Sequence, residues 1–374
     1  MSSGWERVAA HMARSLERRV DALGRGGSAA ARQVVPYRGF GTASELFLTG
    51  RVLANPEPAP VAARDRWWRN LANTLRHMES AEVAGARVRL RVGGGERDTM
   101  TDEEGFYRAW LSPAAPLGDT LWHDVDALVL DRLHPDAGEV RRSGLALVPI
   151  PQAEYGVISD LDDTVIRTDA TRLFRMLRRT LLENARTRLP FEGVAQFYNG
   201  LHAGSTGVAL NPIFYVSSSP WNLYSVLTDF LEHHGIPLGP LTLRDWGISE
   251  SGLLTRGHGE HKLSAICQIM DVYPALPFIL IGDSGQEDPE IYRDVVHQYG
   301  NRIRAIYIRS VTTDPTRARA IGELAEEVRG AGSELLLSED TLASVKHAAE
   351  REWIPPQTVR AVEETVSSAS ARPD

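Results

Sequence analysis

Apolar residues follow two different patterns along the 374-residue chain, and the change falls near residue 150. From about residue 34 to residue 150, short alternating segments dominate. Arg87–Val92, for example, places three apolar side chains on one face of a strand. Residues 93–95 are all glycine and precede no helical pattern, so they predict a hairpin turn and not a phosphate loop. Short strands at regular spacing predict a β-sandwich.

Beyond residue 151 the pattern changes to alternating strands and helices. Short apolar runs predict buried parallel strands, and the segments between them have helical spacing. The expected strands lie near residues 155–160, 213–216, 241–243, 278–281, 303–308 and 334–337. The expected helices lie near residues 222–234, 262–270, 286–298, 316–329 and 339–352. Together they predict an α/β domain with a doubly wound parallel sheet.

Three further helices are expected, the last of them within this alternation. Residues 5–23 have the apolar spacing of an amphipathic helix, residues 63–78 interrupt the sandwich strands, and residues 170–189 form an arginine-rich helix. The predicted organisation is an N-terminal helix and linker (1–32), a β-sandwich-like accessory domain (33–150), the α/β domain (151–354) and a C-terminal tail with a short helix (355–374).

The composition of the chain limits the compartment and the partners that we expect for the protein. Hydrophobic residues make up 43% and charged residues 24%, an ordinary globular balance. Cys267 is the single cysteine, which excludes an internal disulfide and fits a reducing compartment. A net charge of −8 argues against nucleic acid as a partner. No apolar run reaches the ~18 residues of a transmembrane span. We therefore expect a cytoplasmic protein; its oligomeric state is unknown at this point.

The first candidate chemistry follows an apolar run that ends at Asp160, where Asp162 and Thr164 come next. The carboxyl ends of parallel strands border the ligand crevice of an open sheet. Two carboxylates held this close repel each other unless a cation or a shared proton intervenes, and a divalent metal would resolve the conflict. A calcium loop would need Gly and Glu where the chain has Val165 and Thr171, so that alternative fails. Helix N-capping remains an alternative.

Serine and lysine positions add two more segments. An apolar run at 213–216 ends in three serines, Ser217 to Ser219, and a hydroxyl beside backbone N–H groups at a strand end can hold a phosphate. Plain N-capping by Ser218 or Ser219 is the alternative. Lys262 stands near a helix start, where the dipole disfavours a cation, so we expect an aspartate or a phosphate as its partner.

A fourth segment is an apolar run that ends at Asp283, with Asp288 five residues later. Asp283 can join the first carboxylate pair around one Mg²⁺, a hard cation that prefers oxygen ligands. His258 and His261 have a spacing that zinc could use, but no third histidine is close, so a zinc site is disfavoured.

In this order the four segments resemble the haloacid-dehalogenase (HAD) superfamily of phosphotransferases, over roughly residues 153–340. Longer phrases at 160–164, 217–224 and 282–292 resemble one branch of it. That branch holds the phosphatidate phosphatase catalytic domain of the yeast actin-patch protein and its bacterial relatives. The resemblance implies a Rossmann-like HAD fold and a Mg²⁺-dependent phosphatase that converts phosphatidate to diacylglycerol and phosphate through an aspartyl-phosphate.

The same resemblance implies roles for individual residues. Asp160 would attack phosphorus, and Asp162 would serve as general acid and then general base. Lys262 would bridge nucleophile and phosphate, and Ser217 with Ser218 would bind the substrate phosphate. The implied metal ligands are Asp160, Asp162 through its backbone carbonyl, Asp283, and Asp288 through a water molecule.

The substrate class stays open. Residues 167–188 hold seven arginines against two acidic residues, a local charge of +5 in a chain of −8. This segment is either a solvated cap helix or a basic surface that meets anionic lipid, and the helix at 5–23 packs on the protein or lies on a membrane. Three functions compete: a lipid phosphatase with peripheral membrane contact, a phosphatase of a soluble phosphomonoester or phosphoprotein, and a non-catalytic binding protein. The intact motifs disfavour the third.

Overall fold

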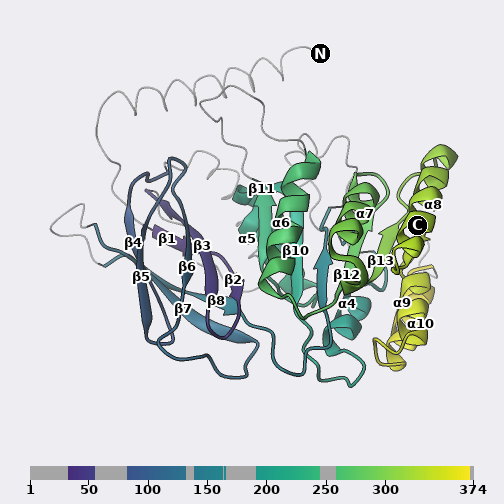
Figure 1. The fold of residues 1–374 in the computed structure, drawn as a ribbon, viewed down its shortest axis with the longest axis horizontal. Coiled ribbons are helices and arrows are strands. Elements are labelled where there is room, and N and C mark those ends of the chain that lie inside the picture. The colour runs from purple at the N-terminus through teal and green to yellow at the C-terminus, as the bar shows by residue number, and fades with distance from the viewer. Residues whose placement is uncertain are drawn as a thin grey trace, which may run out of the picture.

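The computed structural model describes residues 33–54, 82–131, 139–162, 164–165, 191–244 and 258–370. The helices predicted at 5–23, 63–78 and 170–189 lie outside these residues. Figure 1 shows two parts side by side, a strand-rich part formed by the first half of the described chain and an α/β part formed by the second. The sequence pattern predicted this change of architecture near residue 150.

The first part is a sandwich-like assembly of eight strands. Their order is β1-β3-β2-β8-β7-β4-β5, and β6 pairs with β3. The strands are β1 (Gln33–Pro36), β2 (Gly39–Gly41), β3 (Leu46–Leu53), β4 (Arg87–Val92), β5 (Gly95–Met100), β6 (Phe106–Leu111), β7 (Trp122–Val129) and β8 (Arg141–Leu147). All these pairings are antiparallel except that of β2 with β8. A separate apolar core fills the assembly.

Strand β4 shows how the sequence pattern creates this part. Val88, Leu90 and Val92 are buried while the arginines between them are half-buried, as the alternation predicted. Antiparallel pairing of β4 with β5 confirms the predicted hairpin. Its two turn residues, Gly93 and Gly94, have φ of 51° and 77°, the conformation that a type I′ turn requires and that glycine adopts without strain.

The second part contains a six-stranded parallel sheet in the order β11-β10-β9-β12-β13-β14. Its strands are β9 (Gly156–Ser159), β10 (Ile213–Pro220), β11 (Leu241–Arg244), β12 (Phe278–Asp283), β13 (Ile303–Arg309) and β14 (Leu335–Ser338). The chain enters at β9 in the middle, proceeds to one edge, and then continues from β12 to the other edge. The change of direction falls between β9 and β12, and such a switch point is where open α/β sheets bind ligands.

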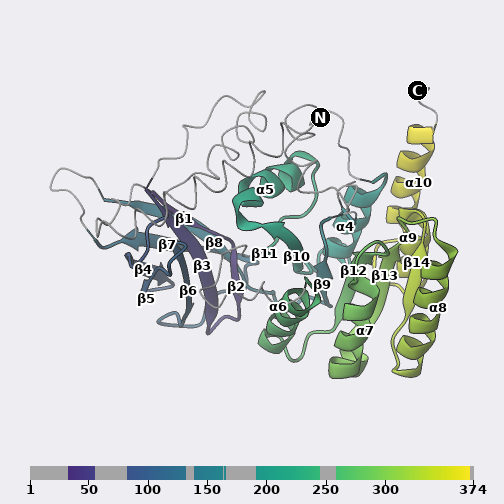
Figure 2. The ribbon, with the colours of Figure 1, turned by 90° about the horizontal axis from the view of Figure 1, so that it is seen from above.

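Helices cover both faces of the parallel sheet (Figure 2). One face carries α4 (Val194–Ala203), α5 (Tyr224–His233), α9 (Thr341–Glu350) and α10 (Gln357–Ser370). The other carries α6 (His258–Val272), α7 (Asp288–Tyr299) and α8 (Pro315–Gly330). Short 3₁₀ helices at Trp221–Leu223 and Gly300–Arg302 precede α5 and β13. None of the described helices has both the length and the apolar character needed to span a membrane.

Helix α4 was not predicted from the sequence. Its buried residues Val194, Phe197, Tyr198 and Leu201 have helical spacing, but Gly200 lowers the intrinsic helix propensity of the segment. Gly200 is explained by packing: a Cβ there would lie 2.6 Å from Thr358 Cγ2 of α10. Glycine thus lets the C-terminal helix approach α4 closely, and the expected short helix of the tail packs on the α/β part.

Candidate active site

Asp160 follows the last residue of β9 at the switch point of the sheet. The whole of β9 is buried between two neighbouring strands, with Ser159 opposite Tyr215 on β10 and opposite Ile281 on β12. The Asp160 backbone N–H donates to the Ile281 carbonyl at 2.9 Å, so the chain stays fixed to β12 one residue beyond β9. Asp160 as a whole residue is 1% exposed.

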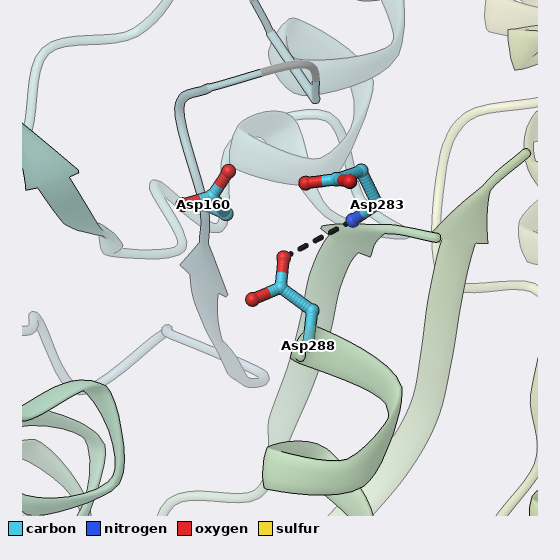
Figure 3. A group of neighbouring side chains, drawn as sticks. All are labelled: Asp160, Asp283 and Asp288. Atoms are coloured by element: carbon cyan, nitrogen blue, oxygen red, sulfur yellow. Dashed lines mark hydrogen bonds between the residues drawn. The ribbon is translucent and has the colours of Figure 1, made fainter. Parts of the chain in front are cut away.

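Two more aspartates face Asp160 from β12 and α7. Asp283 is the last residue of β12, and Asp288 is the first residue of α7. Figure 3 shows the three carboxylates directed toward one another from these elements. One carboxylate oxygen from each lies within 4.8 Å of the others, and all three residues are buried. The Asp283 backbone N–H donates to Asp288 Oδ2 at 3.1 Å, which fixes the distance between β12 and the start of α7.

Lys262 reaches this cluster from the early part of α6. Its Nζ lies 2.8 Å from Asp160 Oδ1 and 2.5 Å from Asp288 Oδ1, and its side chain is 3% exposed. The sequence predicted an aspartate or phosphate partner for Lys262, and the structure provides two aspartates. The contact explains why a cation is tolerated near this helix start.

The electrostatics of the cluster follow from its burial. Burial raises the pKa of Asp160 well above its usual range, and nearby Asp288 and Asp283 add to the rise while Lys262 opposes it. Burial alone would lower the pKa of Lys262, but the carboxylates of Asp160 and Asp288 outweigh it and raise that pKa overall. The site therefore concentrates more negative charge than Lys262 alone compensates.

The Asp162 side chain points toward β10, which lies on the side of β9 opposite to β12. Ser217 Oγ donates to Asp162 Oδ2 at 2.7 Å, and Ser219 Oγ donates to the same oxygen at 3.1 Å. Ser219 N–H in turn donates to Ser217 Oγ at 2.9 Å. Burial raises the pKa of Asp162, and the hydrogen bond from Ser217 opposes this rise. The Asp162 side chain is thus held by hydroxyl groups of β10 and lies outside the carboxylate cluster.

The serine triplet divides between two faces of β10. Ser217 and Ser219 are buried on the same face, whereas the half-buried Ser218 between them faces the other way, as alternation along a strand requires. The sequence assigned phosphate binding to Ser217 and Ser218. In this structure the Ser217 hydroxyl bonds to Asp162, and Ser218 does not share its face. Ser219, for which the sequence offered only helix N-capping, is the second hydroxyl on Asp162.

The loop from β12 to α7 is fixed by groups that the sequence motifs did not indicate. The N–H groups of Gly285 and Gln286 donate to Asp283 Oδ1 at 2.7 and 3.1 Å, and Gln286 Nε2 donates to Oδ2 at 3.1 Å. Arg317 of α8 donates to the carbonyls of Ser284 and Gln286 at 2.8 and 2.6 Å. Arg317 also pairs with Glu290 of α7. These contacts determine where the Asp283 carboxylate points.

The three converging aspartates fit a small divalent cation. Buried carboxylate oxygens are the hard ligands that Mg²⁺ prefers, and three carboxylates with one contacting ammonium leave charge that a dication would balance. The described residues contain one such cluster, and His261 is not part of it. The zinc alternative therefore gains no support from the described part of the chain. Thr164 lies at the margin, with its Oγ1 3.5 Å from Asp160 Oδ2.

Comparison with known proteins identifies relatives of the segment that carries this site. Residues 155–310 match the family model described as the catalytic domain of phosphatidate phosphatase APP1. Phosphatidate phosphatase APP1 of Saccharomyces cerevisiae is 33% identical over 154 residues, which are 41% of this chain and 25% of the yeast protein. An uncharacterised protein of Schizosaccharomyces pombe is 26% identical over 193 residues, 51% of this chain and 30% of that protein.

The chain thus spans between a quarter and a third of the length of these relatives. The matched segment begins just before β9 and ends just after β13, so it includes every aspartate of the site, Lys262 and the serines. This confirms the relationship to the phosphatidate phosphatase catalytic domain that the three sequence phrases indicated. Among solved structures, a β-glucuronidase of Bifidobacterium dentium aligns at 6% identity over 82% of this chain and 52% of that chain, with a TM-score of 0.26.

Proposed function

We propose that this chain is a Mg²⁺-dependent phosphatase of the HAD superfamily that hydrolyses phosphatidate through an aspartyl-phosphate. The observation that carries the proposal is the buried cluster of Asp160, Asp283 and Asp288 with Lys262 at the switch point of a parallel sheet. The relationship of residues 155–310 to the phosphatidate phosphatase catalytic domain supports the reaction class and the substrate.

Asp160 is the proposed nucleophile. One of its carboxylate oxygens forms a bond to phosphorus while the bond from phosphorus to the leaving oxygen breaks, which leaves an aspartyl-phosphate on Asp160. Lys262 contacts Asp160 at 2.8 Å, so its ammonium can direct the carboxylate and stabilise negative charge on the transferring group. Water then attacks phosphorus, releases inorganic phosphate and regenerates the free carboxylate.

Asp162 is the proposed proton carrier. It gives a proton to the leaving oxygen of the substrate in the first step and takes one from the attacking water in the second. The hydroxyls of Ser217 and Ser219 hold its carboxyl group in one orientation in the structure. Ser217 has a second proposed role, binding of a phosphoryl oxygen, which would require its hydroxyl to change partners when substrate is bound.

The residues that would hold Mg²⁺ are Asp160, Asp283 and Asp288, with the backbone carbonyl of Asp162 as a further ligand. When bound, the cation neutralises charge between the carboxylates and the anionic phosphate. Asp288 also bonds to Lys262 and to the Asp283 N–H, so its proposed part is to orient a water ligand. The same proposal includes contact of residues 167–188 with an anionic membrane. It also includes a cytoplasmic location.

The decisive experiment measures phosphate release from a panel of phosphomonoesters that includes phosphatidate in mixed micelles, p-nitrophenyl phosphate and a phosphopeptide. We expect release from phosphatidate with Mg²⁺, and none with excess EDTA. Asp160→Asn serves as the blank, because the amide keeps the shape of the side chain and is not a nucleophile. Full activity of Asp160→Asn would refute the mechanism. A preference for the soluble esters would support the alternative substrate class.

A further inference from the structure

The 3₁₀ turn directly after the serine triplet contacts the sandwich part. The ring of Tyr37, between β1 and β2, stacks on Trp221 with centroids 4.6 Å apart and an interplanar angle of 19°. The same ring lies 4.4 Å from Tyr224, and Phe106 of β6 lies 5.8 Å from Trp221. Tyr37, Phe106 and Trp221 are each less than 9% exposed and belong to one apolar cluster with the parallel sheet. The two parts of the chain therefore share a core at this point.

Arg51 of β3 makes the polar contact across the same boundary. Its Nη1 donates to Asn222 Oδ1 at 3.0 Å, Nη2 to Glu82 Oε1 at 2.5 Å, and Nε to the Glu104 carbonyl at 2.8 Å. The guanidinium also lies 4.5 Å from the centroid of the Phe106 ring. Arg51 is only 6% exposed, and a buried guanidinium is stable where its donors are satisfied in a fixed geometry.

These contacts reach the catalytic group through a short piece of chain. Asn222 stands three residues after Ser219 and five after Ser217, and both serines donate to Asp162. Between them lie Pro220, whose φ is restricted, and Trp221, whose ring is stacked on Tyr37. A displacement of the turn would therefore move the two hydroxyls that orient Asp162.

We propose that Arg51 and Tyr37 of the sandwich part are positioning residues for Asp162. They act through Asn222 and Trp221, which hold the Ser217–Ser219 segment in place. The role of Arg51 and Tyr37 in catalysis rests on the proposed phosphatase function. The inference that the sandwich part fixes residues 217–223 is independent of that function. The accessory part thus completes the active site, in addition to any ligand it binds.

Catalytic measurements separate positioning of Asp162 from general structural support. A displaced general acid slows the departure of a poor leaving group more than that of p-nitrophenolate, which needs little protonation. For Arg51→Met and Asn222→Ala we expect kcat on β-glycerophosphate to fall about 10-fold further than kcat on p-nitrophenyl phosphate, which is part of the ~10²–10⁴ that a general acid supplies. Asn222→Asp keeps the acceptor oxygen and should restore the wild-type ratio.

Arg108→Met is the matched control. Arg108 also lies over the Phe106 ring, at 5.0 Å, but it is 42% exposed and pairs with Asp102 inside the sandwich part. Its loss should leave the ratio of the two kcat values unchanged. An equal fall on both substrates for Arg51→Met and Asn222→Ala, or the same change in Arg108→Met, would overturn the positioning role.

Hydrogen–deuterium exchange tests the structural half of the inference without reference to activity. Backbone amides of residues 217–219 and 221–223 should exchange at least about 10-fold faster in Arg51→Met and Tyr37→Leu than in the wild type or Arg108→Met, because local opening needs fewer contacts to break. Unchanged exchange there would overturn the inference. A wild-type protein that hydrolyses no phosphomonoester would instead refute the proposed function, and the exchange rates would still decide whether the sandwich part fixes this segment.

Discussion

Lys262→Met removes the ammonium group that contacts Asp160 and Asp288 and keeps a side chain of similar length. The Nζ–oxygen distances are 2.8 and 2.5 Å, and the three side chains are 3% exposed or less. Breaking a buried ion pair by removing one partner costs about 3–5 kcal/mol, because the remaining charge stays buried without compensation. In metal-free buffer we therefore expect the free energy of unfolding to fall by about 3–5 kcal/mol.

Urea unfolding followed by tryptophan fluorescence, with EDTA present, measures this difference. Lys346→Met is the control, because Lys346 pairs with Glu363 at 3.3 Å between side chains that are 50% and 46% exposed. Such a surface pair contributes about 0–1 kcal/mol. Lys262→Met/Asp288→Asn should recover part of the loss, since it also removes one unpaired carboxylate. If Lys262→Met costs no more than Lys346→Met, the buried pairing does not stabilise the protein as argued.

Three further predictions concern the other parts of the site. Asp162→Asn should slow hydrolysis of alkyl phosphates more than that of p-nitrophenyl phosphate, and equal slowing in kinetic assays would count against a proton-transfer role. Gly282→Ala should abolish Mg²⁺ binding measured by calorimetry, because the new Cβ would lie 2.5 Å from Asp288 Oδ2; an unchanged affinity would contradict the proposed part of Asp288 in orienting a water ligand of the metal. Arg317→Met should weaken Mg²⁺ binding about 10-fold, because it frees the loop between β12 and α7. Arg329→Met, which removes an exposed pair with Glu326, should leave the affinity unchanged, and equal Mg²⁺ affinities of the two variants would refute this prediction.

The positions of Asp160 and Asp283 could be predicted from the sequence because parallel strands place their carboxyl ends at one edge. Each residue ends an apolar run, and the two runs pair directly as β9 and β12. The contact of Lys262 with aspartate could be anticipated for a different reason, the unfavourable position of a cation near a helix start. In each case a local rule of backbone geometry or electrostatics was sufficient.

Contacts between distant segments could not be predicted in this way. Arg51 and Asn222 are separated by 171 positions, and Arg317 lies 31 positions from Gln286, so no periodicity or motif connects either pair. From the sequence alone, Trp221 and its neighbours could be described only as apolar side chains that follow the serines. Whether these side chains contact a substrate or Tyr37 depends on where the sandwich part packs against the α/β part, which the sequence pattern does not reveal.

The order of strands in the parallel sheet gives the two motif aspartates, Asp160 and Asp162, different surroundings. In a regular strand, side chains two residues apart share a face, but β9 ends at Ser159, before Asp160 and Asp162. Asp160 joins Lys262 and the carboxylates on the β12 side, while Asp162 bonds to Ser217 and Ser219 on the β10 side. Lys262 favours the ionised form of Asp160 against the opposing effects of burial and of the neighbouring carboxylates, and hydroxyl partners suit the proton transfer proposed for Asp162. Two identical side chains two positions apart therefore have different surroundings, because β9 has a different neighbouring strand on each side.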